Sequence, residues 1–186
     1  MRVTGGVKGG ERLLELQDER IRPMRDQVRA ALFNIIREFV PESRFLDLFA
    51  GTGAVGIEAL SRGAKEATFV DHLPEAVRLI KMNLAKLGLT GRARVYRLDV
   101  FEAVARFERR GREYDLIFLG PPYGLGLGHK TLERLGDSGI VAEDGLVIAE
   151  VFKKEQAEME ERYGRLALSL ERRYGDNLIL FYRPEG

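Results

Sequence analysis

From residue 44 onward, short apolar runs alternate with amphipathic stretches of helical length, and this alternation constrains the fold more than any other feature. The apolar runs predict five strands, at residues 45–49, 67–71, 94–98, 114–119 and 145–152. The stretches between and after them predict helices at residues 55–62, 74–87, 100–107, 129–136 and 153–163. Strands that are apolar almost throughout, when joined by helices, are typical of a parallel sheet covered on both faces.

Two closing runs, at residues 166–173 and 177–183, have no helical pattern between them, so we expect them to pair antiparallel. They bring the expected sheet to seven strands, most of them parallel. The sequence therefore predicts an α/β, Rossmann-like fold with helices on both faces of the sheet.

Residues 1–40 break the alternation, and we expect them to form an arm that packs on a core of residues 41–186. Residues 2–5 and 12–16 flank a glycine-rich turn and predict a small hairpin. Residues 25–40 predict one amphipathic helix. Its apolar face would consist of Val28, Leu32, Ile35, Ile36 and Phe39.

The composition limits the class of protein. With 186 residues, 45% hydrophobic and 32% charged, the chain has the size and composition of one soluble domain. It has no cysteine and only two histidines, so we expect neither disulfides nor a metal site. No apolar run approaches the roughly 20 residues that span a bilayer, and the first residues lack the apolar segment of a signal peptide. We therefore expect a cytoplasmic protein without a membrane partner.

Residues 51–56 read G-T-G-A-V-G, a G-x-G-x-x-G pattern between a predicted strand and a predicted helix, and Asp71 ends the next strand. Glycines in such a loop let backbone N–H groups approach a ligand, and the acid can bond a ribose hydroxyl. Because the acid follows about 20 residues on, the pattern alone also fits a nicotinamide dehydrogenase. Glycines that only make a tight turn are the third interpretation.

Two further carboxylates favour S-adenosylmethionine as the cofactor. Asp47 begins the run D-L-F-A-G-T-G, where its carboxylate can face the positively charged end of the methionine moiety. Asp99 closes the third predicted strand, in a position to reach an adenine amine. Ligands of such sheets bind beyond the carboxyl ends of the strands. The predicted cofactor site comprises Asp47, Phe49, Ala50, Gly51, Thr52, Gly53, Asp71, His72, Asp99 and Val100.

The fourth predicted strand ends in G-P-P-Y at residues 120–123, which resembles the Asp/Asn-Pro-Pro-Tyr motif of amino-group methyltransferases. Residues 22–35, R-P-M-R-D-Q-V-R-A-A-L-F-N-I, are similar to a segment of the RsmD family. Residues 5–9, 46–53 and 58–64 resemble further motifs of that family, in family order. The resemblance covers nearly the whole chain. It implies a class I methyltransferase fold and methyl transfer from S-adenosylmethionine to a guanine exocyclic amine in 16S ribosomal RNA, within the small ribosomal subunit. We expect a monomer.

In the related motif, the first side chain and the carbonyl of the first proline accept the two amine hydrogens, which aims the nitrogen lone pair at the methyl group. The aromatic residue stacks on a base taken out of its helix or loop. The resemblance thus implies catalytic roles for Gly120, Pro121, Pro122 and Tyr123, with packing as the alternative for the tyrosine. This chain departs from the family at Met24, where Thr is usual, and at Gly120, where Asp is usual.

The loss of the side-chain acceptor at Gly120 leaves three interpretations open. Backbone carbonyls suffice, or another acid such as Asp26 supplies the acceptor. In the third, the protein is a weakly active or non-catalytic RNA-binding assembly factor that retains the cofactor site. Losing one such hydrogen bond costs about 10²–10³ in rate, so we expect some activity. Because the family residue at this position supplies an acceptor, we expect Gly120→Asp to raise the rate of methyl transfer.

We expect RNA to contact the arm and the loops at the strand ends. The net charge is only +1, but local basic patches can bind phosphates on a nearly neutral protein. The candidates for phosphate contacts are Arg2, Lys8, Arg12 and Arg22. The alternative is that these side chains only form a solvated surface. The arm motif disfavours adenine or glutamine as the methyl acceptor, although similar cores act on both.

Overall fold

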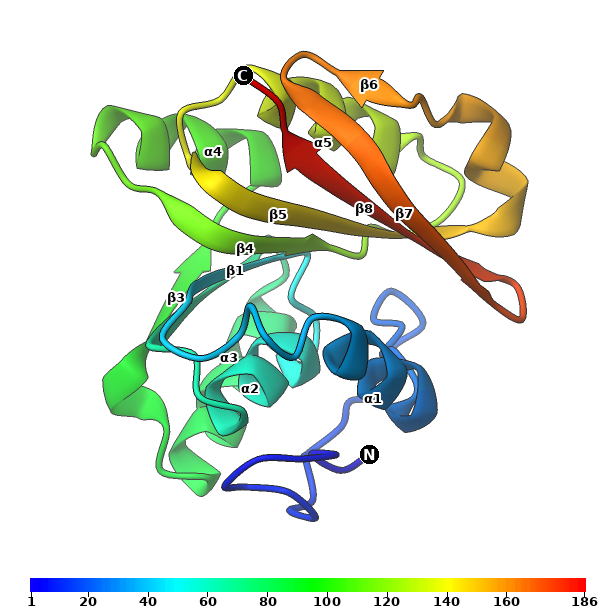
Figure 1. The fold of residues 1–186 in the computed structure, drawn as a ribbon. Helices are drawn as coiled ribbons and strands as arrows, with labels where there is room; N and C mark the ends of the chain where they lie inside the picture. The colour runs from blue at the N-terminus through cyan, green and yellow to red at the C-terminus, as the bar shows by residue number, and fades with distance from the viewer.

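The apolar runs form one sheet, and the stretches between them form the helices that cover it (Figure 1). The structure is a computed structural model that describes residues 1–186. The strands are β1 Arg44–Leu48, β2 Glu66–Asp71, β3 Ala93–Arg97, β4 Tyr114–Leu119, β5 Val141–Phe152, β6 Arg162–Tyr163, β7 Leu166–Tyr174 and β8 Asn177–Pro184. The helices are α1 Asp26–Ile35, α2 Ala54–Ser61, α3 Pro74–Lys86, α4 Val100–Arg109 and α5 Leu127–Gly136. Short 3₁₀ helices lie at Thr90–Arg92 and Lys153–Glu158.

The strands lie in the order β3-β2-β1-β4-β5-β8-β7-β6. Strands β1 to β5 pair in parallel, and β8 and β7 add antiparallel strands at one side. Alternate residues of the strands divide between two hydrophobic clusters. Phe45 and Phe118 belong to the cluster that includes α1, α2 and α3, whereas Leu46 and Ile117 belong to the cluster of α4 and α5. The predicted α/β sheet with helices on both faces and an antiparallel closing pair is therefore confirmed.

The sheet has eight strands, so the prediction of seven was one short. The helix expected at residues 153–163 is replaced by the 3₁₀ helix Lys153–Glu158 and by β6. Gly164, at φ 55°, reverses the chain so that Tyr163 pairs with Leu166 and is buried. This turn requires a left-handed residue, which a continuous helix does not contain.

The arm packs on the core through apolar side chains and one buried ion pair. Its hairpin has a single bridge between Arg2 and Arg12. Helix α1 ends at Ile35 rather than at Val40, and the chain turns over residues 36–39 before Pro41. Arg29 of α1 is fully buried, and its Nε donates to Glu58 Oε1 of α2 at 3.0 Å.

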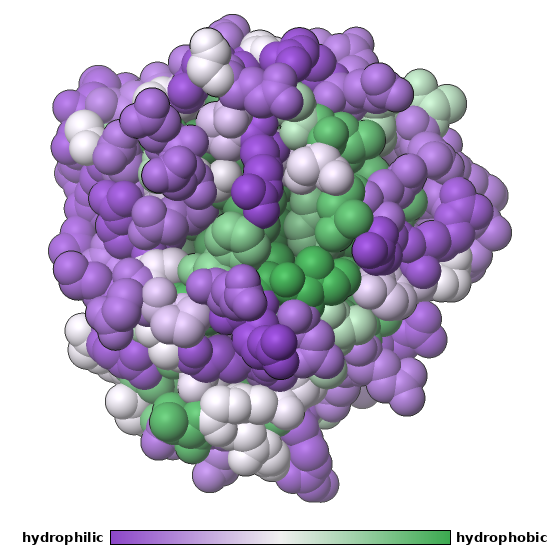
Figure 2. All heavy atoms as spheres, in the orientation of Figure 1, coloured by the Kyte–Doolittle hydropathy of each residue, from purple (hydrophilic) through white to green (hydrophobic).

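Hydrophilic residues cover most of the face shown in Figure 2, and hydrophobic residues gather near its middle, between the strands above and the helices below. No helix combines the length and the apolar character that crossing a membrane requires. The structure also contains no group of three or more His, Cys, Asp or Glu side chains placed to bind a metal ion.

Candidate active site

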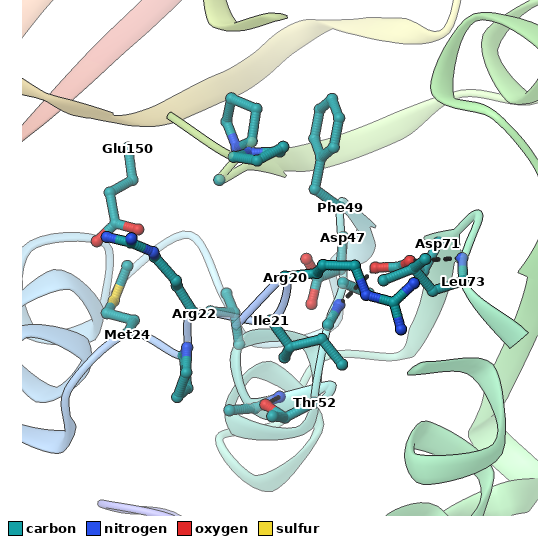
Figure 3. Close-up of a pocket in the computed structure, with 18 of the residues that line it drawn as sticks. Arg20, Ile21, Arg22, Met24, Asp47, Phe49, Thr52, Asp71, Leu73 and Glu150 are labelled. Carbon is teal, nitrogen blue, oxygen red and sulfur yellow. Dashed lines mark hydrogen bonds between the residues drawn. The ribbon is translucent and has the colours of Figure 1, made fainter. Parts of the chain in front are cut away.

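A cavity of about 400 Å³ lies beyond the carboxyl ends of the parallel strands (Figure 3). Its walls come from the loop after β1, the end of β2, the G-P-P-Y segment after β4, and Glu150 of β5. The segment Glu19 to Met24, which leads into α1, completes the wall. In open α/β sheets ligands bind at this edge, so the cavity is the candidate site.

Glycine is required at different positions of the loop after β1 for different structural reasons. Gly51 and Gly53 have φ of 58° and 83°, in the left-handed region that favours glycine, and Gly53 immediately precedes α2. Gly56 lies where α2 approaches β2, since a Cβ there would be 2.4 Å from the Phe69 ring. Phe49 also has a positive φ, of 61°, a conformation that clusters at functional sites in non-glycine residues. The loop therefore has a backbone conformation that requires glycine at residues 51 and 53.

Two carboxylates border this loop. Asp71 Oδ2 accepts from the Gly51 N–H at 2.9 Å, and its Oδ1 accepts from the Leu73 N–H at 3.0 Å. Asp47 is buried and accepts from the Gly56 N–H at 3.0 Å. Burial raises the pKa of Asp47 well above its usual value, and the nearby Asp71 acts in the same direction. A positively charged ligand group beside Asp47 would favour its ionised form.

The G-P-P-Y segment lines the cavity from Gly120 to Tyr123. The Tyr123 hydroxyl donates to Asn177 Oδ1 of β8 at 3.1 Å, and the ring stacks on Phe152 with centroids 5.2 Å apart. The Arg22 guanidinium lies over the same ring, 5.4 Å from its centroid. Burial raises the pKa of Tyr123 to about 12, so the hydroxyl stays protonated and keeps this bond. Tyr123 thus packs as well as lining the site.

Glu150 is the main site residue that the sequence analysis missed. It is 7% exposed, lines the cavity, and points into the end where Arg22 lies (Figure 3). Burial raises its pKa to about 7. An acid that interrupts the apolar run V-I-A-E-V, at the carboxyl end of a predicted strand, was the available signal.

Most of the predicted cofactor residues line the cavity: Asp47, Phe49, Ala50, Gly51, Thr52, Asp71 and His72. Gly53, Asp99 and Val100 lie outside the lining. Asp99 caps α4 instead, and accepts from the Phe101 N–H at 2.8 Å. Its predicted contact with adenine therefore stays a prediction.

The functional residues predicted in the arm also lie partly inside and partly outside the cavity lining. Arg22 lines the cavity, whereas Arg2, Lys8 and Arg12 lie in or beside the hairpin, outside the lining. Asp26 also lies outside it, because its carboxylate accepts from Arg29 Nη2 at 2.9 Å and from the Arg2 N–H at 3.1 Å. Asp26 thus holds the arm together, and the interpretation that it replaces the missing acceptor stays a prediction.

The family described as "Conserved hypothetical protein 95" matches residues 1–183 of this chain. Over 150 residues, the chain is 37% identical to the ribosomal RNA small subunit methyltransferase D of Escherichia coli K12, with 81% of this chain and 74% of that protein covered. The chain belongs to the RsmD family.

Two further proteins, described as a putative rRNA methyltransferase and a putative methyltransferase, match this chain over its whole length. The Bacillus subtilis protein YlbH is 36% identical over 186 residues, with 100% of both chains covered. The solved structure of the Escherichia coli protein yhhF superposes with a TM-score of 0.87 at 30% identity, over 100% of this chain and 98% of that chain. The fold is therefore the Rossmann-like methyltransferase fold, and the family resemblance drawn from the sequence motifs is confirmed.

Proposed function

We propose that this protein transfers a methyl group from S-adenosylmethionine to the exocyclic amine of a guanine in 16S ribosomal RNA. The observation that carries the proposal is that one cavity joins the glycine loop, with Asp47 and Asp71, to the G-P-P-Y segment (Figure 3). Membership of a family whose relatives include a small subunit rRNA methyltransferase supports RNA as the substrate.

The residues of the cavity fit this cofactor. Its volume of about 400 Å³ lies in the usual range for small-molecule sites. Asp71 is held at the end of β2, where it can accept from ribose hydroxyls, and residues 49–52 of the glycine loop line the cavity. The buried Asp47 carboxyl suits the positively charged end of the methionine moiety. When bound, the cofactor supplies a methyl group on a positively charged sulfur.

The G-P-P-Y segment orients the acceptor. A guanine amine is a weak nucleophile because its lone pair is delocalised into the ring. Accepting hydrogen bonds from its hydrogens aims that lone pair out of the ring plane. The Pro121 carbonyl is one acceptor, since proline fixes φ and has no competing N–H. Tyr123 offers a ring on which the extruded base stacks, next to Arg22.

Incubation with labelled S-adenosylmethionine and under-methylated small subunits tests the proposal. We expect label in 16S ribosomal RNA, as N2-methylguanosine after digestion to nucleosides. RNA that binds but acquires no label would show the non-catalytic assembly factor instead. Label in another nucleoside would contradict the guanine amine as the methyl acceptor, but not methyl transfer to the RNA.

A further inference from the structure

Gly120 and Glu150 lie side by side at the ends of adjacent strands. The parallel register of β4 and β5 pairs Leu119 with Ala149, the residue before each of them. A Cβ at position 120 would lie 3.5 Å from Glu150 Oε1. The glutamate carboxylate therefore occupies the space into which a side chain at position 120 would extend.

One oxygen of Glu150 is held and the other is free. Asn177 Nδ2 donates to Glu150 Oε2 at 3.4 Å, and Asn177 Oδ1 accepts from the Tyr123 hydroxyl at 3.1 Å. No protein group donates a hydrogen bond to Oε1, although the side chain is only 7% exposed. Unlike a fully buried atom without a partner, Oε1 reaches the cavity, where a ligand can donate a hydrogen bond to it.

We propose that Glu150 Oε1 accepts a hydrogen bond from the target amine, in place of the side chain that Gly120 lacks, and then takes the proton that the amine releases. This inference rests on the proposed function. It makes Glu150 a catalytic residue, because its oxygen touches the reacting group. The acceptor comes from β5, one strand away from the motif.

The step balances without a further reactant. As the nitrogen–carbon bond forms, the carbon–sulfur bond breaks and its electron pair stays with the sulfur. The amine nitrogen, now positively charged, gives one proton to Glu150 Oε1. The products are a neutral methylated amine and a neutral carboxylic acid, which later returns the proton to water.

The charge on Glu150 sets the pH dependence of this step. Burial raises its pKa to about 7, so the carboxylate is ionised and able to accept only above that pH. The charged and titratable groups that line the cavity with Glu150 include Arg22, Asp47 and Tyr123, and Glu155 acts together with Glu150 and Arg22 on Tyr123. Because Glu150 is protonated below about 7, the rate should rise with pH through about 7.

This geometry reverses the expectation for Gly120→Asp. An aspartate Cβ at position 120 would lie 3.2 Å from a ring carbon of Phe118, as well as 3.5 Å from Glu150 Oε1. Two carboxylates in one buried site disfavour each other's charge. Gly120→Asp alone should therefore lower activity, whereas Gly120→Asp combined with Glu150→Gln returns one carboxylate to the site.

The test uses the full chain, S-adenosylmethionine and under-methylated small subunits in single turnover from about pH 6 to about pH 9. Glu150→Gln should lower the rate about 10²–10³-fold above pH 7 and abolish its rise with pH. Affinity for the cofactor, measured by calorimetry, should stay unchanged. Glu143→Gln, an exposed change on the same strand, is the matched control and should keep the wild-type rate.

Two further measurements keep the inference falsifiable. The double variant should recover at least about tenfold over Glu150→Gln, and NMR should show the Glu150 carboxyl of the free protein titrating near pH 7. The inference would be overturned if Glu150→Gln kept the wild-type rate and pH profile, or if the double variant recovered no activity. It would also be overturned if the Glu150 carboxyl had an ordinary pKa. If the wild type itself transfers no methyl group, the proposed function fails instead.

Discussion

At the level of single residues, Glu150 lies where the motif has lost its side chain. Gly120 has no side-chain acceptor, yet the neighbouring strand places a carboxylate within 3.5 Å of where a Cβ would be. The motif therefore describes the wall of the cavity only in part. The third interpretation of Gly120, a non-catalytic assembly factor, loses its main support if Glu150 acts as proposed.

The raised pKa of Glu150 also predicts a change in stability. Burial raises the pKa of Glu150 from its usual 4.5 to about 7, so folding favours the protonated form. The stability that this group contributes is complete below pH 4.5 and is lost as the pH rises through 7. Glu150→Gln should raise the free energy of unfolding above pH 7, by up to about 3 kcal/mol, and leave it unchanged near pH 4.

Urea unfolding of Glu150→Gln and the wild type, near pH 4 and above pH 7, measures this change in the free energy of unfolding. Glu143→Gln, exposed on the same strand, controls for the loss of one negative charge. Equal effects of both variants would show that Glu150 is not strained by burial.

At the level of elements, the alternation of apolar runs and helices could be read from the sequence because the central strands β1, β2 and β4 are buried on both faces. Phe45 and Leu46, successive residues of β1, enter different hydrophobic clusters, so the strand is apolar at both. The short strand β6 carries no such signal, because only Tyr163 of its two residues is buried. Glu150 escaped prediction for a related reason, since its role depends on which strand lies beside β4.

The docking of the arm depends on a buried ion pair. Arg29 and Glu58 are both fully buried, and Glu58 also accepts from Arg62 Nε at 2.8 Å and from the Thr4 N–H at 3.0 Å. Removing Arg29 leaves the buried Glu58 with only the partly exposed Arg62 as a counterion, and the loss of a buried partner costs about 3–5 kcal/mol. Arg29→Met should therefore lower the free energy of unfolding by about that amount.

Arg25→Met is the matched control, because Arg25 is exposed at the start of the same helix. Urea denaturation of the two variants measures the difference. A loss below about 1 kcal/mol for Arg29→Met, as expected for surface pairs, would show that the arm is held by its apolar contacts alone.

At the level of the whole molecule, RNA has to reach the end of the cavity where Glu150 and Tyr123 lie. Arg22 borders that end, whereas Arg2, Lys8 and Arg12 belong to the hairpin. Arg22→Gln should weaken binding to under-methylated small subunits and reduce the slope of log K against log salt by about 0.7 to 0.9. Binding measured over a range of salt concentrations checks this.

Arg110→Gln, an exposed change at the end of α4, is the control and should leave both the affinity and the slope unchanged. The four basic residues were chosen from charge alone, and only the fold distinguishes Arg22 from the others. An affinity for subunits that does not respond to salt would contradict phosphate contact by Arg22.

A crystal structure with bound S-adenosylhomocysteine tests the central claim most directly. The account predicts the ligand in the cavity, with its ribose hydroxyls within hydrogen-bond distance of Asp71 and its sulfur facing the end formed by Pro121 and Glu150. A ligand bound elsewhere, or a Glu150 carboxylate turned away from the sulfur, would contradict it.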